Sequence, residues 1–151
     1  IRIANFKEQA GKRSEAEWND LLKTAREVVA RQLDIFRGKE VSYDKKGILA
    51  TFDGPARAIR CSEAIVDAAD KHGLAVKSGL HTGECDVADG KYSGFAVELA
   101  CLIANESDPG GILVSRTVKD LVAGSGITFA ERGVSNFDTI EGDWRLFTVT
   151  N

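Results

Sequence analysis

Two lysines, Lys45 and Lys46, occupy the tip of a predicted hairpin and decide what chemistry this tip can do. The flanking sequence, EVSYD at 40–44 and GILATFDG at 47–54, is typical of a strand, a turn and a second strand. A protonated lysine carries a positive charge on a flexible stem, so the tip could attract an anion but cannot ligate a metal ion. Asp44 is acidic and close by, and we interpret it as a turn residue.

Few other side chains indicate chemistry by their type and spacing. His81 ends a predicted strand without a visible catalytic or metal-binding partner, so we predict a structural hydrogen-bonding role for it. Cys61, Cys85 and Cys101 lack metal-ligand spacing and are predicted to be buried thiols. The sequence contains no Walker-type loop, nucleophile elbow or zinc-ligand spacing.

The composition predicts a single domain over residues 1–151. Hydrophobic residues make up 43% of the 151 residues and charged residues 28%, which suits a globular fold with its own core. The formal net charge of -3 argues against bulk electrostatic binding to nucleic acid or anionic lipid. The sequence has no membrane-span or signal-peptide pattern, so we expect a cytoplasmic location. It starts inside a predicted strand, from which we expect a truncated first strand and a longer multidomain protein.

Periodic apolar residues predict the elements that must position these side chains. Ser14 and Glu17 have capping-box spacing, and a helical apolar period follows them as far as Gly38. A second helix is expected to be capped by Asp53, with Pro55 in its first turn. Further strands are predicted at 1–4, 39–43, 48–53, 74–81, 85–87, 112–114, 127–132 and 144–149, and further helices at 94–105 and 115–124. This order favours an α+β domain with a mainly antiparallel sheet flanked by helices.

Five segments that together span nearly the whole chain resemble one known family. They are ILATFDGPARAI at 48–59, GLHTGE at 79–84, GFAV at 94–97, PGGILVS at 109–115 and WRLF at 144–147. In this order and spacing they resemble the catalytic domain of class III adenylyl and guanylyl cyclases, particularly the bacterial forms attached to other modules. The resemblance implies a ferredoxin-like βαββαβ core with extra elements. It also implies fused signalling modules and a head-to-tail dimer, formed with itself or with another cyclase-homology domain.

The same resemblance implies a reaction and two metal ions. In these cyclases the ribose 3'-hydroxyl attacks the α-phosphate, and two Mg or Mn ions stabilise the charge on the phosphate oxygens. The two aspartates that hold the ions in the family fall at Arg2 and Lys46. A unit charge about 4 Å from another contributes on the order of 4 kcal/mol at an effective dielectric constant near 20. Because repulsion replaces attraction at both positions, we expect no metal cofactor here.

The remaining functional positions of the family are altered as well. An asparagine and an arginine that complete the partner subunit's site fall at Glu98 and Leu102, which share one helix face. The base-selecting lysine falls at Ser42, the adenine-contacting aspartate at Lys91, and a triphosphate-binding lysine at Asp138. Losses in both halves of a shared site predict that none of these residues is catalytic.

Three functions stay open at the level of the sequence. The first is a catalytically degenerate cyclase-like domain that acts as a regulatory or dimerisation module in intracellular signalling. The second is a sensor of a small anionic ligand, with Arg2, Lys46 and Lys91 at the former nucleotide cleft and with Glu98 and Asp138 opposing their field. The third is an active cyclase that makes cyclic AMP or cyclic GMP with relocated metal ligands. The damage to both half-sites favours the first.

Overall fold

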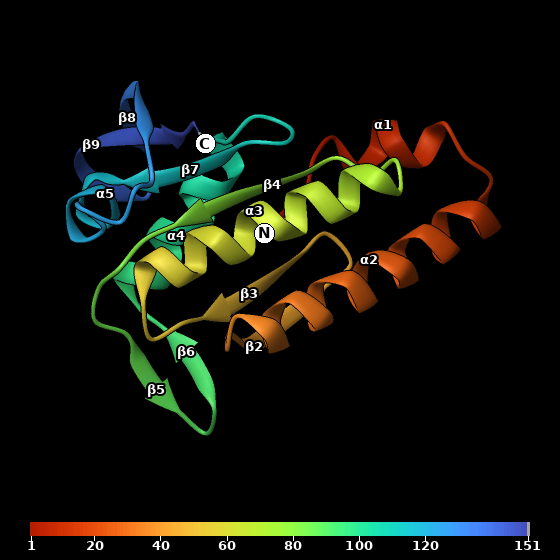
Figure 1. Ribbon diagram of the computed structural model, residues 1–151, viewed down its shortest axis with the longest axis horizontal. Helices are drawn as coiled ribbons and strands as arrows, with labels where there is room; N and C mark the ends of the chain where they lie inside the picture. The colour runs from red at the N-terminus through yellow and green to blue at the C-terminus, as the bar shows by residue number, and fades with distance from the viewer. Residues whose placement is uncertain (151) are drawn as a thin grey trace.

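The computed structural model describes residues 1–150 as five helices and nine strands (Figure 1). In chain order these are β1 (Arg2–Ile3), α1 (Phe6–Gly11), α2 (Glu15–Ile35), β2 (Lys39–Asp44), β3 (Gly47–Thr51), α3 (Pro55–Lys71), β4 (Val76–Leu80), β5 (Asp86–Ala88), β6 (Lys91–Ser93), α4 (Phe95–Glu106), β7 (Ile112–Ser115), α5 (Arg116–Leu121), β8 (Phe129–Phe137) and β9 (Ile140–Val149). Among these residues, no helix combines the length and apolar character needed to cross a membrane.

Seven of the strands form one sheet in the order β2-β3-β1-β4-β7-β9-β8. Neighbouring strands are antiparallel except β4 and β7, which are parallel. Strands β1 to β4 with α2 and α3 reproduce the βαββαβ connectivity of a ferredoxin-like core, as the sequence predicted. Strands β5 and β6 form a separate two-stranded arm that projects from the body of the domain (Figure 1).

Helices cover both faces of the sheet, and alternate residues of β7 pack against the helices on each face. Ile112 and Val114 pack in a cluster with residues of α3 and α5, whereas Leu113 packs in a different cluster with residues of α4. This alternation follows from the period of two along a strand. Helices α2 and α3 lie against each other on one face, and α4 lies on the opposite face (Figure 1).

The starts of the two long helices differ in how well the sequence predicted them. Ser14 and Glu17 form the predicted capping box: Glu17 N–H donates to Ser14 Oγ at 3.1 Å, and Ser14 N–H donates to Glu17 Oε1 at 3.4 Å. The predicted cap at Asp53 is wrong, because Gly54 is the N-cap of α3. The Asp53 carboxylate instead pairs with Arg57, one helical turn further along the chain.

Three other features differ from the sequence-based expectations. Helix α1 was not predicted; it begins after Asn5, whose φ of 46° turns the chain sharply out of β1. Strands β8 and β9 are longer than predicted and pair as one hairpin over most of their length. Cys61 is buried, but Cys85 is exposed beside the arm, so the prediction of a buried thiol is wrong there.

Gly79 allows α4 to pack directly on the sheet. A Cβ atom built on Gly79 would lie 2.2 Å from the backbone nitrogen of Ala104 and 2.5 Å from its Cα. Only a residue without a side chain tolerates such an approach of two backbones. The position of α4, which carries Glu98 and Leu102, is therefore set by a glycine of β4.

Candidate functional site

A cleft of about 280 Å³ lies between the β2–β3 hairpin and α4, on the sheet face opposite α2 and α3. Residues from β1, the hairpin, β4, β6 and α4 contribute to its wall. They are Ile1, Arg2, Ser42, Asp44, Gly47, Ile48, Leu49, Gly79, Tyr92, Val97, Ala100, Cys101 and Ala104. Most of this wall is apolar, and Arg2 is its one basic residue.

The two positions where the family has metal-binding aspartates lie next to each other. Arg2 is opposite Gly47 in the β1–β3 register, and the neighbouring Ile3 N–H donates to the Lys46 carbonyl oxygen at 2.8 Å. Arg2 lines the cleft, whereas Lys46 Nζ lies 6.0 Å from the centroid of the Phe6 ring at the start of α1. Both positions carry a cationic side chain, as the sequence shows.

Asp44 is an acidic residue that lines the same cleft, and it is hydrogen-bonded within the turn. Its Oδ1 atom accepts hydrogen bonds from Lys46 N–H at 2.7 Å and from Gly47 N–H at 3.1 Å. This geometry agrees with the interpretation of Asp44 as a turn residue. Within residues 1–150, no group of three or more His, Cys, Asp or Glu is arranged to hold a metal ion. Divalent Mg and Mn prefer carboxylate and carbonyl oxygens, so this donor set does not fit the two ions of the family.

The two predicted positions on α4, Leu102 and Glu98, lie in different environments. Leu102 is half-buried and packs against a core cluster that includes Leu99 and Phe137. Glu98 is exposed and lines a shallow hollow beside the cleft, together with Phe95 and residues of the β8–β9 turn. Leu102 therefore contributes to packing, and Glu98 places a negative charge at the surface of α4.

The structure brings together only part of the predicted set. Arg2 and Ser42 line the cleft, and Glu98 lines the adjoining hollow. Lys91 begins β6 and Asp138 lies in the β8–β9 turn; both are exposed, and neither lines the cleft. The predicted positions are thus spread over the cleft, the adjoining hollow and exposed parts of the surface.

His81 has the structural contacts that the sequence suggested. Its Nδ1 atom lies 2.8 Å from Ser115 Oγ, and its ring meets the Trp144 ring edge-on at a centroid distance of 6.2 Å. Ser115 Oγ also accepts the N–H of Val118 and so caps α5. Burial lowers the pKa of His81 below its ordinary value of 6.5. The half-buried ring therefore favours its neutral form, and its contact with Ser115 links the end of β4 to the end of β7.

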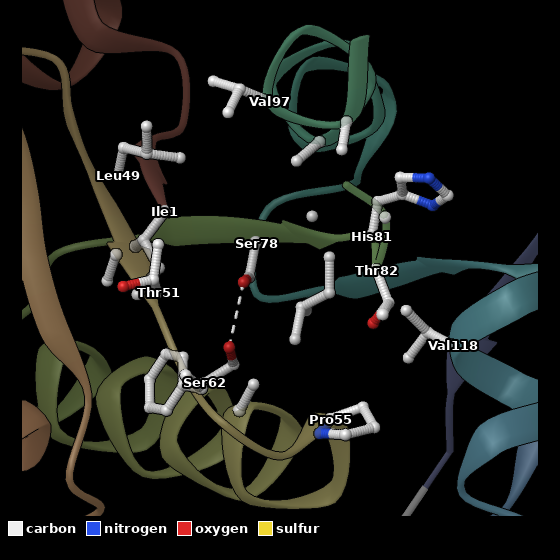
Figure 2. A pocket seen from close by; sticks show the side chains of 18 of the residues that line it. Ile1, Leu49, Thr51, Pro55, Ser62, Ser78, His81, Thr82, Val97 and Val118 are labelled. Atoms are coloured by element: carbon white, nitrogen blue, oxygen red, sulfur yellow. Dashed lines mark hydrogen bonds between the residues drawn. The ribbon is translucent and has the colours of Figure 1, made fainter. Parts of the chain in front are cut away.

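A second cavity, of about 260 Å³, was not predicted from the sequence (Figure 2). It lies between β3 and β4 and adjoins the cleft at Leu49 and Gly79. On its α3 side, Ser78 Oγ donates to Ser62 Oγ at 3.1 Å (Figure 2). Much of its lining comes from two of the segments that carry the family resemblance, at 48–55 and 79–83. The cavity itself depends on how these distant segments are placed in the fold, which the segments alone do not indicate.

Comparison with solved structures gives the fold its name. The adenylate/guanylate cyclase/hydrolase from Silicibacter pomeroyi superposes with a TM-score of 0.84 at 24% identity, over 93% of this chain and 87% of that chain. The adenylyl cyclase CyaB from P. aeruginosa superposes with a TM-score of 0.85 at 17% identity, over 99% of this chain and 90% of that chain. The fold is that of a class III nucleotide cyclase domain. The guanylyl cyclase domain of RhoGC from Blastocladiella emersonii is described as a non-canonical dimer. It superposes with a TM-score of 0.81 at 16% identity, over 98% of this chain and 91% of that chain.

Comparison at the level of sequence is weaker. No protein-family model matches the chain. "Putative adenylate cyclase 3" of Rhizobium meliloti (strain 1021) is 24% identical over 132 residues, which are 82% of this chain. The match spans 22% of that relative's length, about a fifth. Identities at this level establish a cyclase-like fold, and the chemistry has to be argued from the residues of this chain.

Proposed function

We propose that this cyclase-like domain is a catalytically degenerate module that regulates or dimerises within an intracellular signalling protein. One observation carries the proposal: the two adjacent positions that would hold metal ions in the family are Arg2, in β1, and Lys46, in the turn between β2 and β3. Cyclisation gathers negative charge on phosphate oxygens, and the metals that neutralise it need anionic ligands. Two cationic side chains at these positions repel those metals instead.

The half-site that a cyclase lends to its partner supports the same proposal. Leu102 occupies the position of the arginine that stabilises the transition state, and it packs into the core with Leu99 and Phe137. Glu98 occupies the position of an asparagine and adds a negative charge there. A second copy of this chain therefore supplies neither missing function, because the metal half and the transition-state half are both altered in every subunit.

Exposed apolar residues near the arm support a dimerisation role. The Phe95 side chain is 50% exposed at the start of α4, and Val87 in β5 is 59% exposed. Exposed apolar side chains favour protein contact when they form one patch. Phe95 also leans against Trp144 at a ring-centroid distance of 5.5 Å, so it is held in place for such a contact. The dimeric fungal domain shows that this fold can assemble in pairs.

Two measurements on the purified chain test the proposal. Incubation with ATP or GTP and Mn²⁺, followed by chromatography, should yield no cyclic AMP or cyclic GMP. Sedimentation equilibrium should show a dimer that Phe95→Glu weakens and that Leu121→Glu leaves intact, because Leu121 is similarly exposed but lies on α5. Product formation that is lost on mutating Arg2 would establish an active cyclase. A monomer at every concentration would contradict the dimerisation role.

Arg2 also supports a second candidate function, the binding of a small anion in the cleft. Within residues 1–150, no carboxylate lies within ion-pair distance of the Arg2 guanidinium. Ser42 and Tyr92 add hydroxyl groups to the same wall. A thermal-shift panel of nucleotides and other phosphates should then raise the melting temperature of the parent chain but not of Arg2→Ala. Equal shifts in both proteins would place any binding elsewhere.

A further inference from the structure

Charges of opposite sign lie at the two ends of α4, beside the cleft. Glu98 is in the first turn of α4 and lines the hollow together with Glu141. At the other end, the Lys77 Nζ atom donates to the Asn105 carbonyl oxygen at 2.8 Å, and Arg2 is the strand partner of Lys77. Seven sequence positions from Glu98 to Asn105 correspond to roughly 10 Å along a helix. The negative and positive ends of this surface are therefore close neighbours.

The positive end, which we call the basic end, consists of Arg2, Lys45 and Lys46. Arg2 faces the cleft, because Ile3 beside it packs with α2 and α3 and successive side chains of a strand alternate. Lys45 and Lys46 are exposed in the adjoining turn. Among the described residues that line the cleft, Asp44 is the one with a carboxylate, and its Oδ1 atom accepts two backbone N–H groups of the turn. Cations therefore outnumber carboxylates at this end.

The negative end, which we call the acidic end, consists of Glu98, Glu141 and Asp138. Glu98 and Glu141 line the hollow, Asp138 lies in the β8–β9 turn, and all three are exposed. Within residues 1–150, no cationic side chain lines the hollow. In the same range, none of these three carboxylates forms an ion pair, and neither do Lys45 and Lys46. Both ends therefore have charges available for another molecule.

The surface between the two ends is apolar. Phe95 is 50% exposed at the start of α4, and Cys101 and Leu102 are partly exposed further along the helix. The cleft and the hollow also share Tyr92 and Val97 in their walls, so the surface is continuous from one to the other. An uncharged centre with charged side chains at its border is the usual composition of a protein–protein interface.

We propose that two copies of this chain bind through this surface, with the basic end of each copy against the acidic end of the other. A two-fold axis across the middle of α4 produces this arrangement, because it brings each end of the helix opposite the other end in the second copy. The contact then contains two equivalent sets of opposite charges, whereas a contact between like ends is repulsive. The inference rests on the dimerisation role proposed above and adds to it the side chains that the two copies use.

An exchange of charge between two variants tests this pairing. The acidic variant carries Lys45→Glu and Lys46→Glu, and the basic variant carries Glu98→Lys and Glu141→Lys. In either variant alone both ends carry mostly the same sign, so sedimentation equilibrium should show dimerisation at least about tenfold weaker than in the parent. In an equimolar mixture of the two variants, each changed end meets an opposite charge, and most of that loss should be recovered.

The matched control is Lys23→Glu with Arg31→Glu. It makes the same change of net charge as the acidic variant, at exposed positions of α2 on the other face of the sheet, and should dimerise as the parent does. All the substituted positions are exposed, so every variant should fold like the parent, which circular dichroism checks. Added NaCl should weaken the parent dimer and strengthen association of the acidic variant, because salt screens attraction and repulsion alike.

The outcomes separate this pairing from the dimerisation role itself. If the parent is a dimer and both variants dimerise as well as the control, the dimerisation role stands and the pairing is overturned. Weak dimerisation of both variants without recovery in their mixture also overturns the pairing. A parent that is monomeric at every concentration contradicts the dimerisation role and the pairing together.

Discussion

Arg2 lies directly opposite Gly47 across the β1–β3 pair, so it neighbours Lys46 in space although 43 positions separate Arg2 and Lys46 in the sequence. Antiparallel pairing thus brings together the two cations that occupy the positions where the family resemblance would place two metal-binding aspartates. The two cations come from different elements, Arg2 from the central strand and Lys46 from the hairpin turn. Both therefore add positive charge to the same small region of the surface.

The pairing of Arg2 with the hairpin predicts that the metal site can be rebuilt. The double variant Arg2→Asp, Lys46→Asp should bind Mn²⁺ at least about tenfold more tightly than the parent, because each exchange replaces repulsion by attraction. Loss of the free Mn²⁺ signal in electron paramagnetic resonance measures the binding. The control is Arg2→Asn, Lys46→Asn, which removes the positive charges without adding negative ones. If the two variants bind equally weakly, the two positions do not converge on one ion.

The contact between β4 and α4 predicts a large loss of stability for Gly79→Ala. The new Cβ would meet the Ala104 backbone at 2.2 Å, and a backbone cannot move aside as a flexible side chain can. The free energy of unfolding should fall by about 3 kcal/mol or more, at the upper end for overpacking. Gly11→Ala is the matched control, since nothing lies within 4 Å of its Cβ, and it should change stability by less than about 1 kcal/mol. Urea denaturation measures both, and similar losses would contradict the proposed close packing.

The hairpin turn predicts a modest effect for Asp44→Ala. The substitution removes the acceptor of two backbone hydrogen bonds, from Lys46 and Gly47, at a surface site. The free energy of unfolding should decrease by about 1 kcal/mol, while Lys45→Ala should change it by less than about 0.5 kcal/mol. Asp44→Asn keeps an acceptor oxygen and should recover most of the loss. If Asn is as destabilising as Ala, the carboxylate has a role other than that of a turn acceptor.

The burial of His81 predicts a pH dependence of stability. Its pKa is lower in the folded chain than the ordinary value of 6.5, so the unfolded chain binds more protons at acid pH. The contribution of His81 is therefore complete above pH 6.5 and is lost as the pH falls from there through the folded-state pKa. Between about pH 7.5 and about pH 5, the free energy of unfolding of the parent should fall by more than that of His81→Gln, as measured by urea denaturation. Equal losses would show that other groups cause the acid sensitivity.

The sequence predicted the architecture well because its signals are local. The capping box at Ser14 and Glu17 and the glycine-rich break before β7 are read within a few residues. Helix α1 was missed because six residues give too short a period, and its start depends on the left-handed conformation of Asn5. The cap at Asp53 was mistaken because the sequence also offers Arg57 as a partner, and local pattern does not decide between them.

The site was predicted less completely, for a physical reason. Resemblance to a family located Arg2 and Lys46, and pairing in the structure brings them together. The turn role of Asp44 was predicted because it is local: its Oδ1 accepts the N–H of Lys46, two residues further on. The packing of Leu102 against the core was not predicted, because it depends on tertiary contacts. The cavity between β3 and β4 was missed for the same reason: its lining residues Ala50 and Gly79 are far apart in the chain and come close only in the folded sheet.

The close contact at Gly79 also has a mechanical consequence. Helix α4 meets β4 backbone against backbone there, so these two elements move as a unit. This unit supplies Gly79, Val97 and Ala100 to the cleft, whereas the β2–β3 hairpin supplies the opposite wall. The width of the cleft therefore changes when the hairpin moves relative to the unit of β4 and α4.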